Sequence, residues 1–328
     1  MTPGTQTYVP VRNLLTTKIK NMERKISVDD LRKAVYDAYE EVKSIKEGTI
    51  DPRNVGADPK AFGITVVLPD GTTIEKGDTQ VKSPLGSIVK VPVSSVLFTQ
   101  NKPMELIKKS GQCPCHKVEA KPRDLAFSAH GVRAFSAIEP VGDPESKWNL
   151  VENRMTDLMG SAPELDDKVY QALEKEAADN DLVNKLATDG YYLYDDAKLS
   201  VDLYLKGLSM TASTSQLAMM GATIAADGVN PATGRIVFDG AITQNIVALM
   251  AAKGPHKMRA PWLVAAGIPA KSSFGGAILG ILPGTMAIAA YGAELNPAGV
   301  SVKAARAIIS VMQKLDISIF SSSRVKFV

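Results

Sequence analysis

The chain has 328 residues, of which 45% are hydrophobic and 22% are charged, as in a soluble globular protein with a sizeable core. A formal net charge of only +3, with lysines and glutamates well mixed, argues against a nucleic-acid-binding track. The N-terminus has no apolar run, and Pro283 and several glycines interrupt the longest uncharged stretch, residues 272–293. We therefore expect no secretory signal, no membrane helix and a cytoplasmic location.

The first helix that the sequence predicts follows Ser27. Ser27 and Asp30 resemble an N-terminal capping pair, and apolar residues then recur at helical spacing up to Ile45, with Gly48 as a stop. We assign residues 1–47 to an N-terminal extension. Its amphipathic helix has to pack on the rest of the domain or on a partner subunit.

Strands are expected near both ends of the chain and helices between them. Residues 63–68 and 72–74 read as a hairpin, and residues 277–282 and 286–291 as two more strands. Several segments between and after them have helical patterns. These segments are 87–98, 149–187 with a break near 178–180, 200–208, 215–226, 242–252 and 302–315. The prediction is an α+β fold, in which an antiparallel sheet from 60–80 and 270–295 is flanked by helices, with a helical part at 87–260.

Ser87 and Lys90 form an S-x-x-K pattern at the start of a buried helix. At this spacing both side chains lie on one helical face. A serine hydroxyl is too weak an acid to attack an amide unaided, but a desolvated amine can take its proton. The alternative is a capping serine beside a solvated lysine.

Both cysteines lie in the run Cys113-Pro114-Cys115, directly before His116. One intervening proline makes a disulfide between them geometrically poor, and a zinc site would need ligands beyond the remaining His130 and His256. We favour a reduced surface loop and no bound metal.

A helical S-x-x-K pattern and a late K-S-[ST] strand resemble the penicillin-binding-protein and serine β-lactamase superfamily. Three further runs resemble the serine-dependent glutaminases within it. They are VDLYL at 201–205, MGATIAADGVNP at 220–231 and GIPAKS at 267–272. The resemblance extends from about Gly48 to Leu315 and is strongest over 200–290. It implies a hydrolase domain at 48–320, followed by a short tail at 321–328.

The resemblance implies a role for each matching residue. Ser87 would be the nucleophile and Lys90 its base, Tyr204 would hydrogen-bond near the reacting centre, and Lys271 would add positive charge. The backbone N–H groups of Ser87 and Phe274 would form the oxyanion hole. Without the family, Tyr204 reads as a core tyrosine and Lys271 as a solvated lysine.

The sequence departs from the family pattern among the substrate-binding residues. By register, Ile50 replaces a tyrosine, Ser128 an asparagine, His256 a second tyrosine and Phe274 a valine. Lost hydroxyl and amide partners change discrimination steeply. His256 is either a general acid or base near neutral pH or a loop histidine beside Lys257.

The substrate's amino group would be held by a glutamate and an asparagine, which we place at Glu174 and Asn180.

These observations predict a serine-dependent amidase that needs no cofactor and, if it keeps the family activity, hydrolyses L-glutamine to L-glutamate and ammonia. One alternative is an amide or ester hydrolase, or an acyltransferase, with a different substrate. Another is a binding protein that kept the fold and lost the reaction. The expected partners are a small-molecule amide and further copies of the same chain.

Overall fold

The structure is a computed structural model that describes residues 23–102, 105, 129–188 and 193–328. Its α-helices are α2 (Val28–Val42), α3 (Lys90–Gln100), α5 (Ala129–Ser136), α6 (Pro144–Met159), α7 (Asp167–Asp179), α8 (Leu182–Thr188), α9 (Ala197–Ser209), α10 (Thr214–Ala225), α11 (Thr243–Lys253), α12 (Arg259–Ala266) and α13 (Val302–Leu315). Its short 3₁₀ helices are η1 (Gly86–Val89), η2 (Gly240–Ile242) and η3 (His256–Met258). Its strands are β1 (Glu23–Ile26), β2 (Thr49–Ile50), β3 (Phe62–Val67), β4 (Thr73–Gly77), β5 (Ser83–Pro84), β6 (Glu164–Leu165), β7 (Met210–Ala212), β8 (Ala270–Ser272), β9 (Ala277–Leu282), β10 (Met286–Gly292), β11 (Glu294–Leu295) and β12 (Arg324–Phe327).

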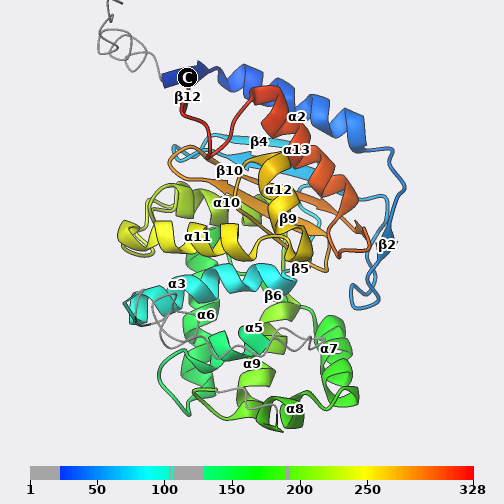
Figure 1. Ribbon diagram of the computed structural model, residues 1–328, viewed down its shortest axis with the longest axis vertical. Coiled ribbons are helices and arrows are strands. Elements are labelled where there is room, and N and C mark those ends of the chain that lie inside the picture. The colour runs from blue at the N-terminus through cyan, green and yellow to red at the C-terminus, as the bar shows by residue number, and fades with distance from the viewer. Residues whose placement is uncertain (1–22, 103–104, 106–128, 189–192) are drawn as a thin grey trace, which may run out of the picture.

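A five-stranded antiparallel sheet in the order β4-β3-β10-β9-β8 forms the centre of the molecule (Figure 1). The central strand β10 pairs with β3 from the early part of the chain and with β9 from the late part, as at Ala289, which lies opposite both Thr65 and Leu279. Every residue of β3, β9 and β10 is buried, which explains their continuous apolar sequences.

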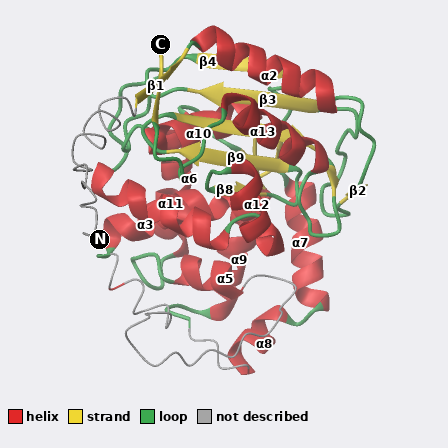
Figure 2. Ribbon diagram, turned by 45° about the horizontal axis from the view of Figure 1, so that its top comes forward, coloured by secondary structure: helices red, strands yellow, loops and turns green. Residues whose placement is uncertain are grey.

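Helices α2, α12 and α13 cover one face of this sheet (Figure 2). Alternate strand residues such as Ile64, Val66 and Ile288 point into this layer and pack on Leu31 and Val35 of α2, among others. Ser27 caps α2 as expected, because its Oγ accepts the N–H of Asp30 at 3.0 Å. The N-terminal helix therefore packs on its own chain, chiefly against α13.

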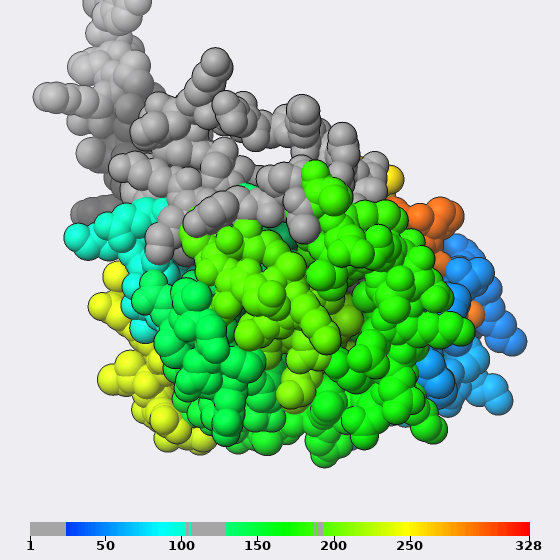
Figure 3. Space-filling view, turned by 90° about the horizontal axis from the view of Figure 1, so that it is seen from below, coloured from blue at the N-terminus to red at the C-terminus, as the bar shows by residue number. Residues whose placement is uncertain are grey.

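The opposite face of the sheet is covered by α10, beyond which lies a larger group of helices (Figure 1). Leu279, Ile281 and Ala287 point toward α10, which in turn contacts α6. Helices from residues 129–209 fill the end of the molecule farthest from the sheet (Figure 3). The α+β class with an antiparallel sheet and an inserted helical part is thus confirmed.

The structure also contains features that the sequence analysis did not predict. The segment 149–187 has a second interruption at Gly160, a left-handed residue that ends α6. Strands β1 and β12, at the two ends of the described chain, pair in parallel. Lys271 lies on the expected K-S-S strand, which is the edge strand β8. No helix in the described part of the chain is long and apolar enough to span a membrane.

Candidate active site

Ser87 lies in the 3₁₀ turn η1, immediately before α3. Three residues per turn stack side chains i and i+3 over one another, and the N–H of Lys90 donates to the carbonyl of Ser87. Gly86 has a φ of +47°, and a Cβ there would lie 2.9 Å from Cδ1 of Phe274. Glycine is therefore required directly before Ser87, both for its backbone conformation and for the close approach of Phe274.

Lys90 is partly buried at the start of α3, and its Nζ lies 5.7 Å from the centre of the Tyr204 ring. Burial, with the positive charges of Lys271 and Lys253, lowers the pKa of Lys90 to about 7. A substantial fraction of this lysine is unprotonated near neutral pH, as a base partner for Ser87 requires.

Lys271 lies on the edge strand β8 and is 6% exposed. Its Nζ donates to the carbonyl of Gly254 at 3.0 Å, and burial together with Lys253 lowers its pKa to about 8. The hydrogen bond to Gly254 fixes the position of the Lys271 amine. The positive charge of that amine in turn contributes to the lowered pKa of Lys90. Lys271 is buried and hydrogen-bonded, so the interpretation as an ordinary solvated lysine is wrong.

His256 lies in the loop that joins α11 to α12, with its backbone at a φ of +46°. The backbone N–H of His256 donates to the Gly254 carbonyl, which also accepts a hydrogen bond from Lys271 Nζ. Partial desolvation, followed by the charges of Lys271, Lys90 and Arg53, lowers the pKa of His256. The imidazole is therefore neutral at pH 7, where it can accept a hydrogen bond but is neither a ready proton donor nor a strong base.

The two backbone groups expected to form an oxyanion hole, the N–H groups of Ser87 and Phe274, donate no hydrogen bond to any described residue. Both belong to segments that touch at Gly86 and Phe274. Two such donors are the feature that a tetrahedral oxyanion needs.

The segment before Ser87 is tied to the turn that follows β8. Ser273 Oγ donates to the carbonyl of Pro84 at 2.5 Å and accepts the N–H of Gly275 at 2.8 Å. The buried amide of Asn54 donates to the Gly275 carbonyl at 3.0 Å. These bonds join three distant parts of the chain around Ser87, and so fix its position relative to β8.

Tyr204 is 2% exposed on α9, where its ring lies against Gly131 of α5 so closely that any side chain at 131 would collide with it. Burial raises its pKa well above the usual value, so the phenol is neutral. Its ring faces the Lys90 amine and also packs on Phe135 at 5.9 Å. The site is therefore closed on one side by an aromatic wall.

The glutaminase family model matches residues 52–320 of this chain. The chain belongs to the glutaminase family. A glutaminase of Bacteroides thetaiotaomicron is 34% identical over 92% of this chain and 98% of its own length. One of Parabacteroides distasonis is 32% identical over 94% of this chain and all of its own.

Solved structures agree with this family assignment. The probable glutaminase YbaS has a TM-score of 0.80 and 26% identity, and covers 90% of this chain and all of its own. The Bacillus subtilis glutaminase YbgJ has a TM-score of 0.73 at 22% identity, over 89% of this chain and 98% of its own, and so supports the fold alone. That structure is a covalent complex with 5-oxo-L-norleucine, formed with 6-diazo-5-oxo-L-norleucine.

The structure does not bring the expected substrate-binding residues Glu174 and Asn180 together at the candidate site, as it does the expected catalytic residues. Glu174 is exposed on α7. The side-chain amide of Asn180 donates a hydrogen bond to the carbonyl of Glu176 at 2.8 Å. Ser128, Cys113 and Cys115 lie outside the described residues. The described residues contain no cluster of histidine, cysteine and carboxylate side chains that could hold a metal.

The sequence analysis missed Arg53, which lies over the Phe274 ring, and Glu176, which lies beside Arg53. The guanidinium of Arg53 lies 4.7 Å from the centre of the Phe274 ring, and its Nη1 lies 3.7 Å from Glu176 Oε2. The position of Arg53, directly after the expected Ile50-Asp51-Pro52 register, is the one sequence signal that could have drawn attention to it.

Proposed function

We propose that this member of the glutaminase family hydrolyses the carboxamide of L-glutamine to L-glutamate and ammonia through an acyl-enzyme on Ser87. The observation that supports it most directly is the lowered pKa of Lys90, about 7, one 3₁₀ turn from Ser87. Relatives named glutaminases, at 31–34% identity over most of the chain, supply the substrate.

In the proposed reaction the neutral Lys90 amine takes the proton from Ser87 Oγ as the oxygen attacks the amide carbon. The N–H groups of Ser87 and Phe274 stabilise the oxyanion, and each donor of this kind contributes about 3 kcal/mol in the transition state. Lys90 then returns the proton to the departing nitrogen, which leaves as ammonia. Water attacks the acyl-enzyme by the same route and releases the acid.

Lys271 and His256 have supporting roles in this proposal. The charge of Lys271 disfavours a proton on Lys90, and its bond to the Gly254 carbonyl holds the loop that carries His256. Neutral His256 is a hydrogen-bond acceptor for the substrate or for the water that attacks the acyl-enzyme.

A second candidate function is hydrolysis or acyl transfer with a different amide or ester. The bulk of Phe274 against the turn before Ser87 favours it, because a large ring changes the shape available to the acyl group. Ammonia release from L-glutamine, compared with release from a panel of other amides, separates the two.

The central experiment uses Ser87→Ala, with Ser94→Ala as the matched control. Ser94 lies on α3, which follows the η1 turn of Ser87. Its hydroxyl donates to the Lys90 carbonyl at 2.6 Å. We expect Ser87→Ala to abolish both glutamine hydrolysis and covalent labelling by 6-diazo-5-oxo-L-norleucine, and Ser94→Ala to retain both. Labelling on another residue, or undiminished turnover in folded Ser87→Ala, would contradict the mechanism.

A cytoplasmic location and a homo-oligomeric state, both expected from the sequence, stay predictions.

A further inference from the structure

Arg53 is held rigidly beside the candidate active site. Its Nε and Nη2 atoms donate to the two carboxylate oxygens of Asp51 at 2.8 and 2.7 Å, a two-pronged pairing. The face of its guanidinium lies over the ring of Phe274 at 4.7 Å. A long, flexible side chain is thereby confined to one orientation, with 29% of its surface exposed.

This arginine is connected to the region around Ser87 by direct contacts. Phe274, on which it lies, approaches the Gly86 turn, and the neighbouring Asn54 is bonded to the Gly275 carbonyl. Its charge opposes the burial that raises the pKa of Tyr204, and it adds to the burial and the two lysine charges that lower the pKa of His256. Arg53 therefore faces the same space as the predicted catalytic groups.

One end of the guanidinium is not used by Asp51. Nη1 makes no hydrogen bond to any described residue, and Glu176 Oε2 lies 3.7 Å from it, a charge contact too long for a hydrogen bond. The pair Arg53–Glu176 thus presents an N–H donor and a carboxylate acceptor side by side. An amino acid carries the complementary charges, an ammonium and a carboxylate, on a single carbon.

We propose that Arg53 binds the α-carboxylate of the amino-acid substrate through Nη1. Glu176, beside it, then takes the ammonium-binding role that the family resemblance gives to a glutamate and that the sequence analysis placed at Glu174. This assignment rests on the proposed function and specifies how the site recognises its substrate. It explains how a chain with Ile50 and Ser128 in place of a family tyrosine and asparagine keeps a zwitterionic substrate, because the charged guanidinium of Arg53 replaces these neutral partners. Asp51 and Phe274 act as positioning residues that orient the guanidinium.

The test compares three amides with the same reacting end. L-Glutamine has both charged groups, 4-aminobutanamide lacks the α-carboxylate, and 5-amino-5-oxopentanoate lacks the α-amino group. Arg53→Met should lower kcat/KM for L-glutamine and 5-amino-5-oxopentanoate by about 10- to 100-fold, the usual size for a charge-assisted hydrogen bond, and change 4-aminobutanamide less than about threefold. Glu176→Gln should spare 5-amino-5-oxopentanoate instead.

Arg306→Met is the matched control, because Arg306 forms a comparable two-pronged pair with Glu47 on the opposite side of the sheet. It should leave all three substrates unchanged. Arg53→Lys keeps the charge without the fork and should recover part of the glutamine activity. An equal loss for all three amides in Arg53→Met would overturn the proposal and indicate a structural role.

A binding measurement separates this inference from the reaction itself. In calorimetric titrations, Ser87→Ala should bind L-glutamate at least tenfold more tightly than Ser87→Ala/Arg53→Met does. That result without any glutamine turnover in the wild-type chain would support Arg53 and refute the proposed function. Turnover in the wild-type chain, with equal L-glutamate binding by the two variants, would support the function and refute the role of Arg53.

Discussion

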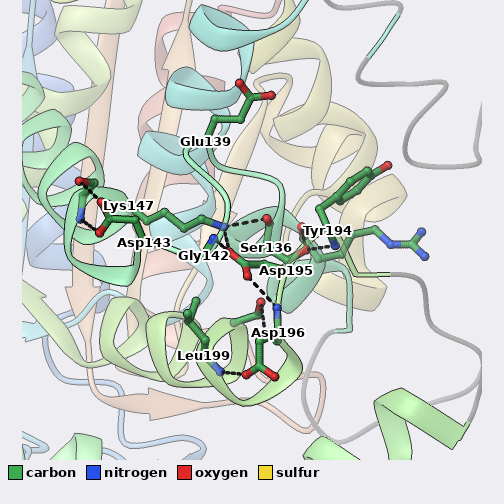
Figure 4. A network of polar contacts seen from close by, with 12 residues as sticks. Ser136, Glu139, Gly142, Asp143, Lys147, Tyr194, Asp195, Asp196 and Leu199 are labelled. Atoms are coloured by element: carbon green, nitrogen blue, oxygen red, sulfur yellow. Dashed lines mark hydrogen bonds and ion pairs between the residues drawn. The ribbon is translucent and has the colours of Figure 1, made fainter.

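Two lysines of this protein, the buried Lys147 and the partly buried Lys90, have opposite surroundings. Lys147 on α6 is completely buried, and its Nζ lies 2.5 Å from Asp195 Oδ2 and 3.0 Å from the Ser136 carbonyl (Figure 4). Lys90 has no carboxylate partner among the described residues, and its charged neighbours are Lys271 and Lys253.

The surroundings of Lys147 form a closed polar network. Asp195 also accepts the N–H groups of Gly142 and Asp196 at 2.9 and 2.8 Å, and Ser136 Oγ accepts the N–H of Tyr194 (Figure 4). Burial opposes the charge of Asp195, but these bonds and Lys147 hold its pKa below the usual range. The bonds of Lys147 join α5, α6 and the segment before α9.

The comparison shows how one residue type is used for structure in one place and for chemistry in another. The ion pair with Asp195 and the hydrogen bond to the Ser136 carbonyl make Lys147 part of the packing that stabilises the fold. The absence of such partners, with two like charges nearby, destabilises the protonated form of Lys90. The unprotonated amine that the proposed reaction requires is therefore obtained at the expense of folding stability.

The largest expected effect is that of Lys90→Met, which removes the proposed base. We expect kcat/KM for glutamine to fall by about 10³-fold. Stability should change in the opposite direction. Because the folded-state pKa of about 7 lies below the unfolded value of 10.5, protonated Lys90 costs stability that is recovered only as the pH rises from 7 toward 10.5.

Urea unfolding at pH 7 measures this second effect. Methionine has no such cost, so Lys90→Met should raise the free energy of unfolding by an amount on the order of 3 kcal/mol. The gain should shrink as the pH rises from 7 and vanish near pH 10.5, above which the wild-type lysine is neutral in both the folded and the unfolded states. A variant that is both inactive and less stable than the wild type would contradict the comparison.

Lys147→Met should have the reverse effects. It leaves the buried Asp195 carboxylate without its cation, and breaking a buried pair in this way costs about 3–5 kcal/mol. Activity per folded molecule should stay close to that of the wild type, since the network contains no proposed catalytic group. The measurements are urea unfolding and the glutamine rate on the same preparations.

The double variant Lys147→Met/Asp195→Leu is the control for this prediction. Removing both charges should restore most of the lost stability, because no uncompensated ion then stays buried. A double variant as unstable as the single one would mean that the hydrogen bonds of Asp195, rather than its charge pairing, stabilise this region.

The sequence predicted the sheet and most helices because these depend on local patterns. A continuous run of buried residues marks β3, turn residues separate it from β4, and a capping serine marks α2. The parallel pair β1–β12 was missed, because its register joins Glu23 to Arg324 across almost the whole chain and no local period records such a pairing.

The candidate site divides in the same way. Ser87, Lys90 and Lys271 belong to runs whose spacing carries the chemistry, so sequence alone could place them. Arg53 lies in an irregular segment, and its importance depends on a contact with Phe274, more than 200 residues away. The burial of Lys147 was equally unpredictable, because a lysine on an amphipathic helix normally reads as solvated.

The smallest expected effect concerns the pH dependence of the reaction. Lys90 must be unprotonated to act as base, so kcat/KM should rise as the pH passes about 7. It should fall again as Lys271 loses its charge near 8, which gives a narrow bell whose two limbs belong to the coupled pair. A pH profile for glutamine hydrolysis measures both limbs.

Lys253→Met sharpens this prediction, because Lys253 is exposed and lies outside the proposed machinery, yet its charge lowers the pKa of both lysines. Removing it should move both limbs to higher pH by about 0.3 units, with little change at the maximum. The shift should shrink in high salt, because exposed charges are screened. Lys33→Met, on the far side of the sheet beside Asp37, should move neither limb. The ascending limb could instead keep its position in Lys253→Met and shift in Lys33→Met. The group that titrates would then not be Lys90, and the contrast between Lys147 and Lys90 would have no link to catalysis.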